Sequence, residues 1–131
     1  MSQENVEIVQ AGFAAWNAGE MDAMGELLAE DVVLRLPEGW PEPGPYVGRE
    51  ATMRQYAQNR ATFDADRLEA ISDFIGVGDR VLVRTIWRGM GQGPEAAQEW
   101  TVSLTLRNGK IVNIDYFWNH AEALDAVGLS E

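Results

Sequence analysis

The chain has 131 residues, no cysteine, one histidine, five tryptophans and a formal net charge of −11. This length fits one domain, residues 1–131, whose core needs no covalent cross-links. Without cysteine there are no disulfides or thiol nucleophiles, and one histidine excludes a multi-histidine metal site within the chain, so we expect no cofactor. The acidic balance disfavours nucleic acids and membranes as partners, because their phosphates are also negative.

The first twenty residues contain three glutamates and no basic residue, which is not the pattern of a signal peptide. No apolar run approaches the roughly 20 residues that a membrane-spanning helix needs. We therefore expect a cytoplasmic protein.

The chain begins with helical spacing. Its first apolar residues recur every three or four positions and predict one helix with a single apolar stripe, made of Val6, Val9, Phe13 and Trp16. Gly19 suits the left-handed end of this helix. Asp22 is a candidate cap for a short second helix, and "DVVLRLP", residues 31–37, is typical of a strand stopped by proline.

Residues 37–48 form a Pro- and Gly-rich loop, and residues 49–62 are predicted to be helical. From Arg67 onward the apolar period changes to two, which predicts four successive strands at 67–77, 80–89, 98–107 and 110–118. Asn119 and Glu122 fit a capping box for a short final helix. Helices followed by a run of strands indicate an α+β fold with an antiparallel sheet.

The Asn108-Gly109 pair predicts a two-residue hairpin turn between the last two strands. Regular pairing outward from that turn sets Val102 opposite Asp115 and Trp100 opposite Phe117. One face of the sheet then carries Trp100, Val102, Leu104, Leu106, Ile111, Asn113, Asp115 and Phe117. We expect this face to pack against the helices, which directs Asp115 into the fold.

The opposite face of the last predicted strand is also rich in apolar side chains: Val112, Ile114, Tyr116 and Trp118. An apolar patch of that size on an outer surface favours contact with a partner. We therefore expect a homodimer that forms through the outer face of the sheet.

Arg84 lies on the same face of its predicted strand as Leu82 and Ile86. If that face points inward, Arg84 can meet Asp115, keep it ionised and leave it able to act as a general base. The same pair can instead serve only as a structural ion pair, or Arg84 can hold a carboxylate or enolate group of a ligand.

Three stretches, residues 13–37 "FAAWNAGEMDAMGELLAEDVVLRLP", 46–56 "YVGREATMRQY" and 108–129 "NGKIVNIDYFWNHAEALDAVGL", together resemble the nuclear transport factor 2-like superfamily in its SnoaL-like branch. The resemblance implies a cone, in which a curved sheet wraps around helices and encloses a pocket. It also implies dimerisation through the outer sheet face. It does not fix a function, because the superfamily contains enzymes and non-enzymes.

Ketosteroid isomerases of this superfamily use a tyrosine and two aspartates. The corresponding positions here hold Gly12, Leu36, and Val102 or Ser103, so that activity is not expected. Limonene epoxide hydrolases use an Arg-x-Asp pair and a second aspartate. Arg84 and Asp115 match two of these groups, whereas Ile86 replaces the acid.

Polyketide cyclases of the SnoaL type use a carboxylate base, for which Asp115 is a candidate. We find no match for their accompanying histidine, since His120 falls in the predicted capping turn of the last helix. Asp115 therefore matches a carboxylate in both the limonene epoxide hydrolases and the polyketide cyclases.

The sequence leads to one main hypothesis and two alternatives. The main one is a cofactor-independent hydrolase, isomerase or cyclase, acting on a small apolar oxygenated molecule with Asp115 as base and Arg84 as its partner. The expected substrate-binding residues are Trp16, Tyr46, Tyr56, Trp100, Phe117 and Asn113. The alternatives are a non-catalytic small-molecule binding protein and a dimeric interaction module.

Overall fold

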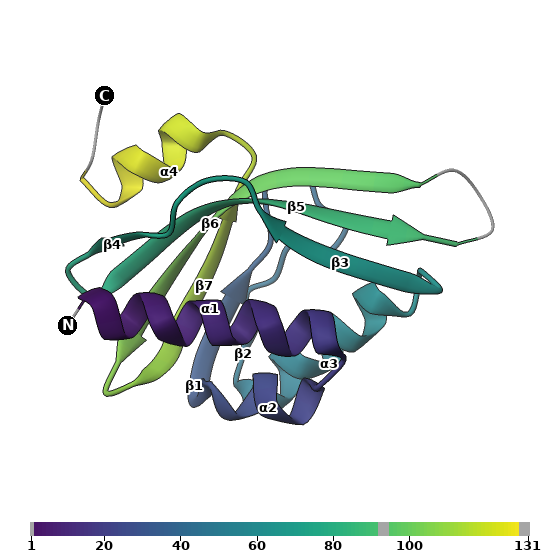
Figure 1. The fold of residues 1–131 in the computed structure, drawn as a ribbon, viewed down its shortest axis with the longest axis horizontal. Coiled ribbons are helices and arrows are strands. Elements are labelled where there is room, and N and C mark those ends of the chain that lie inside the picture. The colour runs from purple at the N-terminus through teal and green to yellow at the C-terminus, as the bar shows by residue number, and fades with distance from the viewer. Residues whose placement is uncertain (1, 92–94, 129–131) are drawn as a thin grey trace.

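The computed structural model describes residues 2–91 and 95–128. Along these residues the elements are α1 (Ser2–Ala18), α2 (Met21–Glu26), β1 (Leu28–Arg35), β2 (Tyr46–Val47), α3 (Arg49–Arg60), β3 (Ala65–Ala70), β4 (Ile75–Val77), β5 (Arg80–Met90), β6 (Ala96–Arg107), β7 (Lys110–Phe117) and α4 (His120–Ala126). Figure 1 shows α1 crossing one side of a curved sheet, with α2 and α3 near its far end. The predicted α+β class is confirmed.

The sheet has the strand order β2-β1-β7-β6-β5-β3, and β4 pairs with β5. Every described pair is antiparallel except β1 with β7, which run parallel. The sheet is antiparallel as predicted, apart from this one parallel pair. The parallel pair is possible because a long connection through α3 and five strands, β2 to β6, separates β1 from β7.

The N-terminal elements follow their sequence signals closely. Val9 and Trp16 on the apolar stripe of α1 are buried, and Gly19, at φ 74°, ends the helix in the left-handed region. The expected cap at Asp22 is wrong, because the N-cap of α2 is Glu20, two residues earlier, and it makes no side-chain cap hydrogen bond.

The predicted strand over residues 67–77 is divided in two. β3 and β4 both pair with β5, and the residues between them lie outside any strand. Phe74 in this break packs edge-on against Phe13 of α1, with 5.4 Å between ring centroids. The break thus brings an aromatic ring from the sheet edge onto the first helix.

A β-bulge in β7 changes the predicted register. Arg107 pairs with Lys110 and Leu106 with Ile111 as expected, but Thr105 then pairs with Asn113, so Val112 is an extra residue. One inserted residue moves every later side chain to the opposite face. Val102 consequently faces Tyr116, while Asp115 faces Ser103.

The bulge occurs where β7 meets β1 as well as β6. Leu28 of β1 pairs with Ile111, and the next partners are Val33 and Asn113, so the β1 register also shifts here. Leu28 and Ile111 are both fully buried. Their contact holds the start of β7 in place, and the bulge then turns Ile114 and Tyr116 inward.

Two expectations are corrected by this register. Asn113, Asp115 and Phe117 do not face the helices of the main core, and the predicted outer patch of Val112, Ile114, Tyr116 and Trp118 does not exist as such. Phe117 instead packs with Leu82 beneath α4, in a second small cluster.

The capping box of α4 is confirmed in its first half, since Asn119 Oδ1 accepts hydrogen bonds from the backbone N–H groups of Ala121 and Glu122. His120 lies in the first turn of α4, where its Nδ1 is 2.9 Å from Thr101 Oγ1. Among the described residues, no helix is long and apolar enough to cross a membrane.

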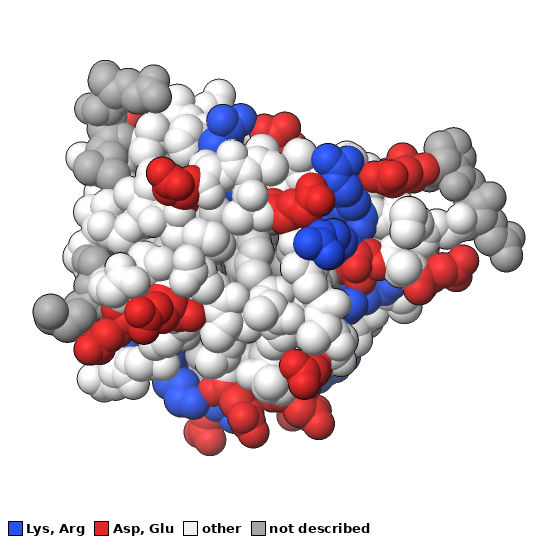
Figure 2. Space-filling model, in the orientation of Figure 1, with Lys and Arg blue, Asp and Glu red and all other residues white. Residues whose placement is uncertain are grey.

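Most charged side chains of the described residues lie at the surface in mixed groups, and Asp66 is a buried exception. Figure 2 shows basic side chains beside acidic ones over the part of this face near β3. Arg67 and Arg88 both pair with Glu69 of that strand, at 3.7 and 3.0 Å. The middle of the same face is uncharged.

Candidate functional site

A cavity of ≈ 60 Å³ lies between the helices and the inner face of the sheet. The helices α1 and α2 contribute Val9, Gly12, Phe13, Trp16 and Met24 to its lining. The strands contribute mainly Trp87, Trp100, Val102, Leu104, Ile111 and Ile114. These walls are largely apolar, so the cavity suits a hydrophobic guest.

Two tyrosines place their hydroxyl groups together at this cavity. Tyr56 comes from α3 and Tyr116 from β7, and their oxygens are 3.2 Å apart. Burial, with the neighbouring Tyr116, raises the pKa of Tyr56 well above its usual value. Burial raises the pKa of Tyr116 to about 12, although its hydrogen bond with Tyr56 opposes the rise. Both hydroxyls are therefore neutral at pH 7 and can donate or accept hydrogen bonds.

Two further polar atoms in the lining residues are buried and lack a hydrogen-bond partner within the described part of the chain. They are the indole Nε1 of Trp100 and the hydroxyl Oγ1 of Thr85. A buried donor without a partner costs about 1–3 kcal/mol. A guest molecule or water with an acceptor oxygen would remove that cost.

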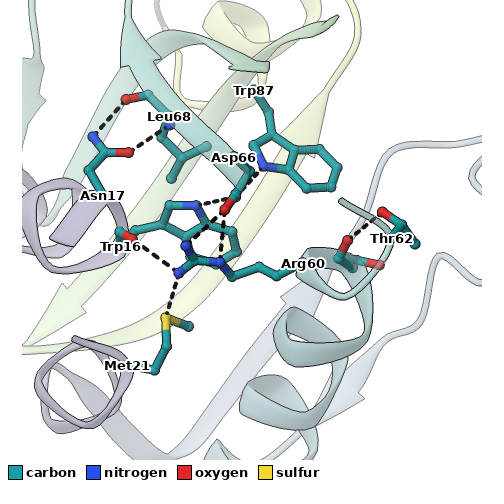
Figure 3. A network of polar contacts seen from close by, with 9 residues as sticks. Trp16, Asn17, Met21, Arg60, Thr62, Asp66, Leu68 and Trp87 are labelled. Atoms are coloured by element: carbon teal, nitrogen blue, oxygen red, sulfur yellow. Dashed lines mark hydrogen bonds and ion pairs between the residues drawn. The ribbon is translucent and has the colours of Figure 1, made fainter. Parts of the chain in front are cut away.

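Asp66 of β3 holds two of the lining tryptophans in place (Figure 3). Its Oδ2 accepts hydrogen bonds from the indole N–H groups of Trp16 and Trp87, each at 2.7 Å. Its Oδ1 pairs with Arg60 at 2.8 Å, and the Asp66 side chain is only 4% exposed. Since both oxygens are engaged, Asp66 positions the aromatic wall.

Arg60 completes this network from the end of α3. Its guanidinium lies 4.6 Å from the ring centre of Trp16 and donates to the backbone oxygen of the same residue. Beside it, the Asn17 amide makes two hydrogen bonds with the backbone of Leu68, as Figure 3 shows. These contacts attach α1 and α3 to the edge strand β3.

Three of the six predicted substrate-binding residues line the cavity: Trp16, Tyr56 and Trp100. Asn113 and Phe117 do not, because the bulge turns them to the outer face. Tyr46 is also outside the lining, and its hydroxyl donates to the backbone oxygen of Glu42 in the Pro-rich loop.

The predicted pairing of Arg84 with Asp115 inside the fold is wrong. Arg84 bonds Glu99 at 2.7 Å, and Asp115 pairs with Arg35 at 3.5 Å, away from the cavity lining. Partial burial raises the pKa of Asp115, and the positive charges of Arg35 and Arg80 oppose that rise. Arg84 points outward because Val81, Val83, Thr85 and Trp87 occupy the inner face of β5.

Sequence reasoning missed Tyr116, Thr85 and Trp87 as lining residues. The alternation of β5 contained a usable signal, since the set with Val81, Val83 and Trp87 is more apolar than the set with Arg84 and Arg88. No comparable signal indicated Tyr116, because its direction depends on the bulge. No group of three metal-binding side chains occurs in residues 2–91 and 95–128.

The SnoaL-like domain family matches residues 9–114, and the chain belongs to this family. The predicted resemblance is therefore confirmed. No curated protein matches the chain at a significant level.

Solved structures share the fold at low sequence identity. TerC, co-crystallised with polyporic acid, is 23% identical over 95% of this chain and 97% of its own, with a TM-score of 0.77. A protein with a ketosteroid isomerase-like fold from Catenulispora acidiphila, in complex with trimethylamine, is 23% identical over 94% and 93%, with a TM-score of 0.73. A putative polyketide cyclase from Xanthomonas campestris pv. campestris is 25% identical over 97% and 98%, with a TM-score of 0.71.

Proposed function

We propose that the chain binds a neutral small molecule whose compact, mainly apolar part enters the cavity with one hydroxyl or carbonyl group, and does not transform it. The hydroxyl pair of Tyr56 and Tyr116 in an otherwise apolar cavity carries this proposal. Such a pair can donate to an acceptor oxygen of the guest or accept from its hydroxyl group. The guest is then oriented by hydrogen bonds and retained by the aromatic walls.

The absence of a base near the guest argues for binding without turnover. No aspartate, glutamate, histidine or lysine belongs to the described lining, and the two tyrosines keep their protons at pH 7. A general base must reach the proton that it removes, directly or through one water. Asp115, the predicted base, lies on the other face of the sheet.

The size of the cavity limits the guest. An engineered cavity that takes up benzene has a volume of about 150 Å³. The cavity found here is smaller, at ≈ 60 Å³. A single ring therefore enters when half-buried side chains of the lining, such as Phe13 and Leu68, shift outward. Phenol is a suitable probe, and toluene is its partner of similar shape without the hydroxyl.

The experiment measures phenol and toluene affinities for the wild type and for Tyr116→Phe, by calorimetry and tryptophan fluorescence. One lost hydrogen bond weakens phenol binding by roughly 3- to 10-fold and leaves toluene binding unchanged. Tyr46→Phe is the matched control, because it removes a tyrosine hydroxyl outside the cavity. Equal losses for both probes, or no binding of phenol to the wild type, would contradict the proposal.

We also propose a homodimer through the outer sheet face, supported by the resemblance to the superfamily. The apolar patch first expected there is absent, and the Arg84–Glu99 ion pair makes part of that face polar. Sedimentation velocity over a range of protein concentrations tests the assembly, and a single monomeric species throughout would refute it.

A further inference from the structure

A groove of ≈ 770 Å³ lies outside the cavity, between the Pro-rich loop, α3 and the ends of β6 and β7. Trp40 and Trp118 contribute its aromatic surface, and Gln55, Gln58, Asn59 and Gln98 contribute amide groups. A smaller hollow of ≈ 170 Å³ adjoins it, lined in part by Trp40, Asn59, Trp87 and Gln98.

The three hollows lie next to one another and share lining residues. Asn59 lines the cavity, the small hollow and the groove. Trp87 is shared by the cavity and the small hollow, while Trp40 and Gln98 are shared by the small hollow and the groove. A ligand whose ring lies in the cavity reaches the groove when these shared side chains move apart.

The groove presents aromatic faces that are held in place. Trp118 is 44% exposed, and its indole N–H donates to the backbone oxygen of Glu38 at 2.8 Å. The Trp40 ring lies 6.2 Å from that of Trp118 and also contacts Trp100 of the cavity wall at 5.8 Å. An exposed, anchored indole offers a flat surface for the C–H groups of a ring.

The polar groups of the groove favour a neutral hydroxylated guest. An amide side chain carries donors and an acceptor, which matches the hydroxyl group, itself a donor and an acceptor. Gln55 is buried and its Nε2 already donates to Asn59 Oδ1 at 3.2 Å. Gln58 and Gln98 are exposed, so their amides are accessible from solvent. The described lining contains no lysine or arginine to neutralise an anion, and Glu42 adds a negative charge.

We propose that this groove binds a neutral polyhydroxylated group of glycosyl type, attached to the apolar ring that occupies the cavity. This inference rests on the proposed function and specifies its ligand as an aryl glycoside or a molecule of the same chemistry. The aryl part lies between the tyrosine pair and the tryptophan wall. The hydroxylated part lies on Trp118 and the amides.

The test compares phenol with 4-hydroxyphenyl β-D-glucopyranoside by calorimetry, because this glucoside keeps a free phenolic hydroxyl for the tyrosine pair. We expect the glucoside to bind about tenfold more tightly than phenol, since it adds hydrogen bonds and an aromatic contact. Gln98→Ala should remove most of that gain and leave phenol affinity unchanged. Gln10→Ala, an exposed glutamine on α1 outside the groove, should change neither affinity.

The outcomes separate this inference from the proposed function. Phenol binding with no gain for the glucoside, or an equal gain in Gln98→Ala, overturns the groove assignment and leaves the cavity proposal intact. A larger gain for the 4-hydroxyphenyl ether of choline than for the glucoside also overturns it, because the tryptophans would then be a cation site. If phenol fails to bind, methyl β-D-glucopyranoside alone tests the groove: shifts of the Trp118 indole NMR signal support it, and their absence refutes it.

Discussion

Asp66 accepts hydrogen bonds from the two indoles of Trp16 and Trp87 and forms an ion pair with Arg60. Replacing Asp66 with asparagine removes the negative charge that pairs with the guanidinium of Arg60. It also puts an NH2 group in place of one carboxylate oxygen, and this group cannot accept a hydrogen bond from an indole N–H. We expect a loss of about 3 kcal/mol in the free energy of unfolding, measured by urea denaturation. The loss should be accompanied by weaker phenol binding, because both indoles line the cavity.

Asp64→Asn is the control for that change, since Asp64 is exposed and two residues away. It should shift the unfolding free energy by no more than about 0.5 kcal/mol, as surface substitutions usually do. If Asp66→Asn were as mild as Asp64→Asn, the network of Figure 3 would not be a main support of the aromatic wall.

Asp115 gives a pH-dependent prediction. Burial raises its folded pKa above the ordinary value, so the folded state binds its proton more tightly than the unfolded state does. Its stabilising contribution is then complete below the ordinary pKa of about 3.9 and is lost as the pH rises through the raised folded value. The Asp115→Asn variant lacks this titration.

The measurement is the unfolding free energy of wild type minus that of Asp115→Asn, taken between pH 3 and pH 7. The difference should fall as the pH rises from the acid end and then become constant. A difference that grows with pH would mean that Arg35 stabilises the ionised carboxylate more than burial destabilises it.

At the scale of elements, helices and strands were predictable because their signals are local. The apolar stripe of α1, the hairpin turn at Asn108-Gly109 and the N-cap at Asn119 depend on residues close in sequence, and each is present. The split of the 67–77 segment and the parallel β1–β7 pair depend on contacts between distant residues. Those contacts leave no periodic pattern in the sequence.

In the candidate site too, features with local signals were predictable and features set by contacts between distant residues were not. Both registers of β7 leave apolar residues on the inner face, so alternation alone cannot choose between them. The register of β7 is set by the bulge at Val112, which follows the pairing of Ile111 with Leu28 of β1. Trp16, Tyr56 and Trp100 were predictable as lining residues because they lie outside the shifted segment. Asp115 was not, since it follows the bulge.

The turn after α3 packs closely on β5 through Phe63. A side-chain carbon at Gly89 would lie 2.4 Å from the ring of Phe63, whose ring packs edge-on against Trp87. Gly89→Ala should therefore lower the free energy of unfolding by about 1–3 kcal/mol, as overpacking does. Gly91→Ala is the matched control and should have little effect in the same denaturation experiment, because no atom of the described residues lies within 4 Å of the added carbon.

The whole molecule carries a formal net charge of −11, with acidic side chains spread over the face shown in Figure 2. Such a field repels an anionic ligand whatever its local contacts. 4-Hydroxyphenyl β-D-glucuronide differs from the glucoside only in a carboxylate that replaces the hydroxymethyl group. We expect the glucuronide to bind several-fold more weakly than the glucoside at low salt.

Salt separates this long-range repulsion from poor local fit. The screening length falls from about 30 Å at 0.01 M salt to about 3 Å at 1 M, so high salt should bring the two affinities closer together. A glucuronide that stays equally weak at every salt concentration would place the discrimination in the groove itself, at Glu42 and the amides. Glucoside affinity should change little over the same range, because a neutral ligand does not respond to the net charge.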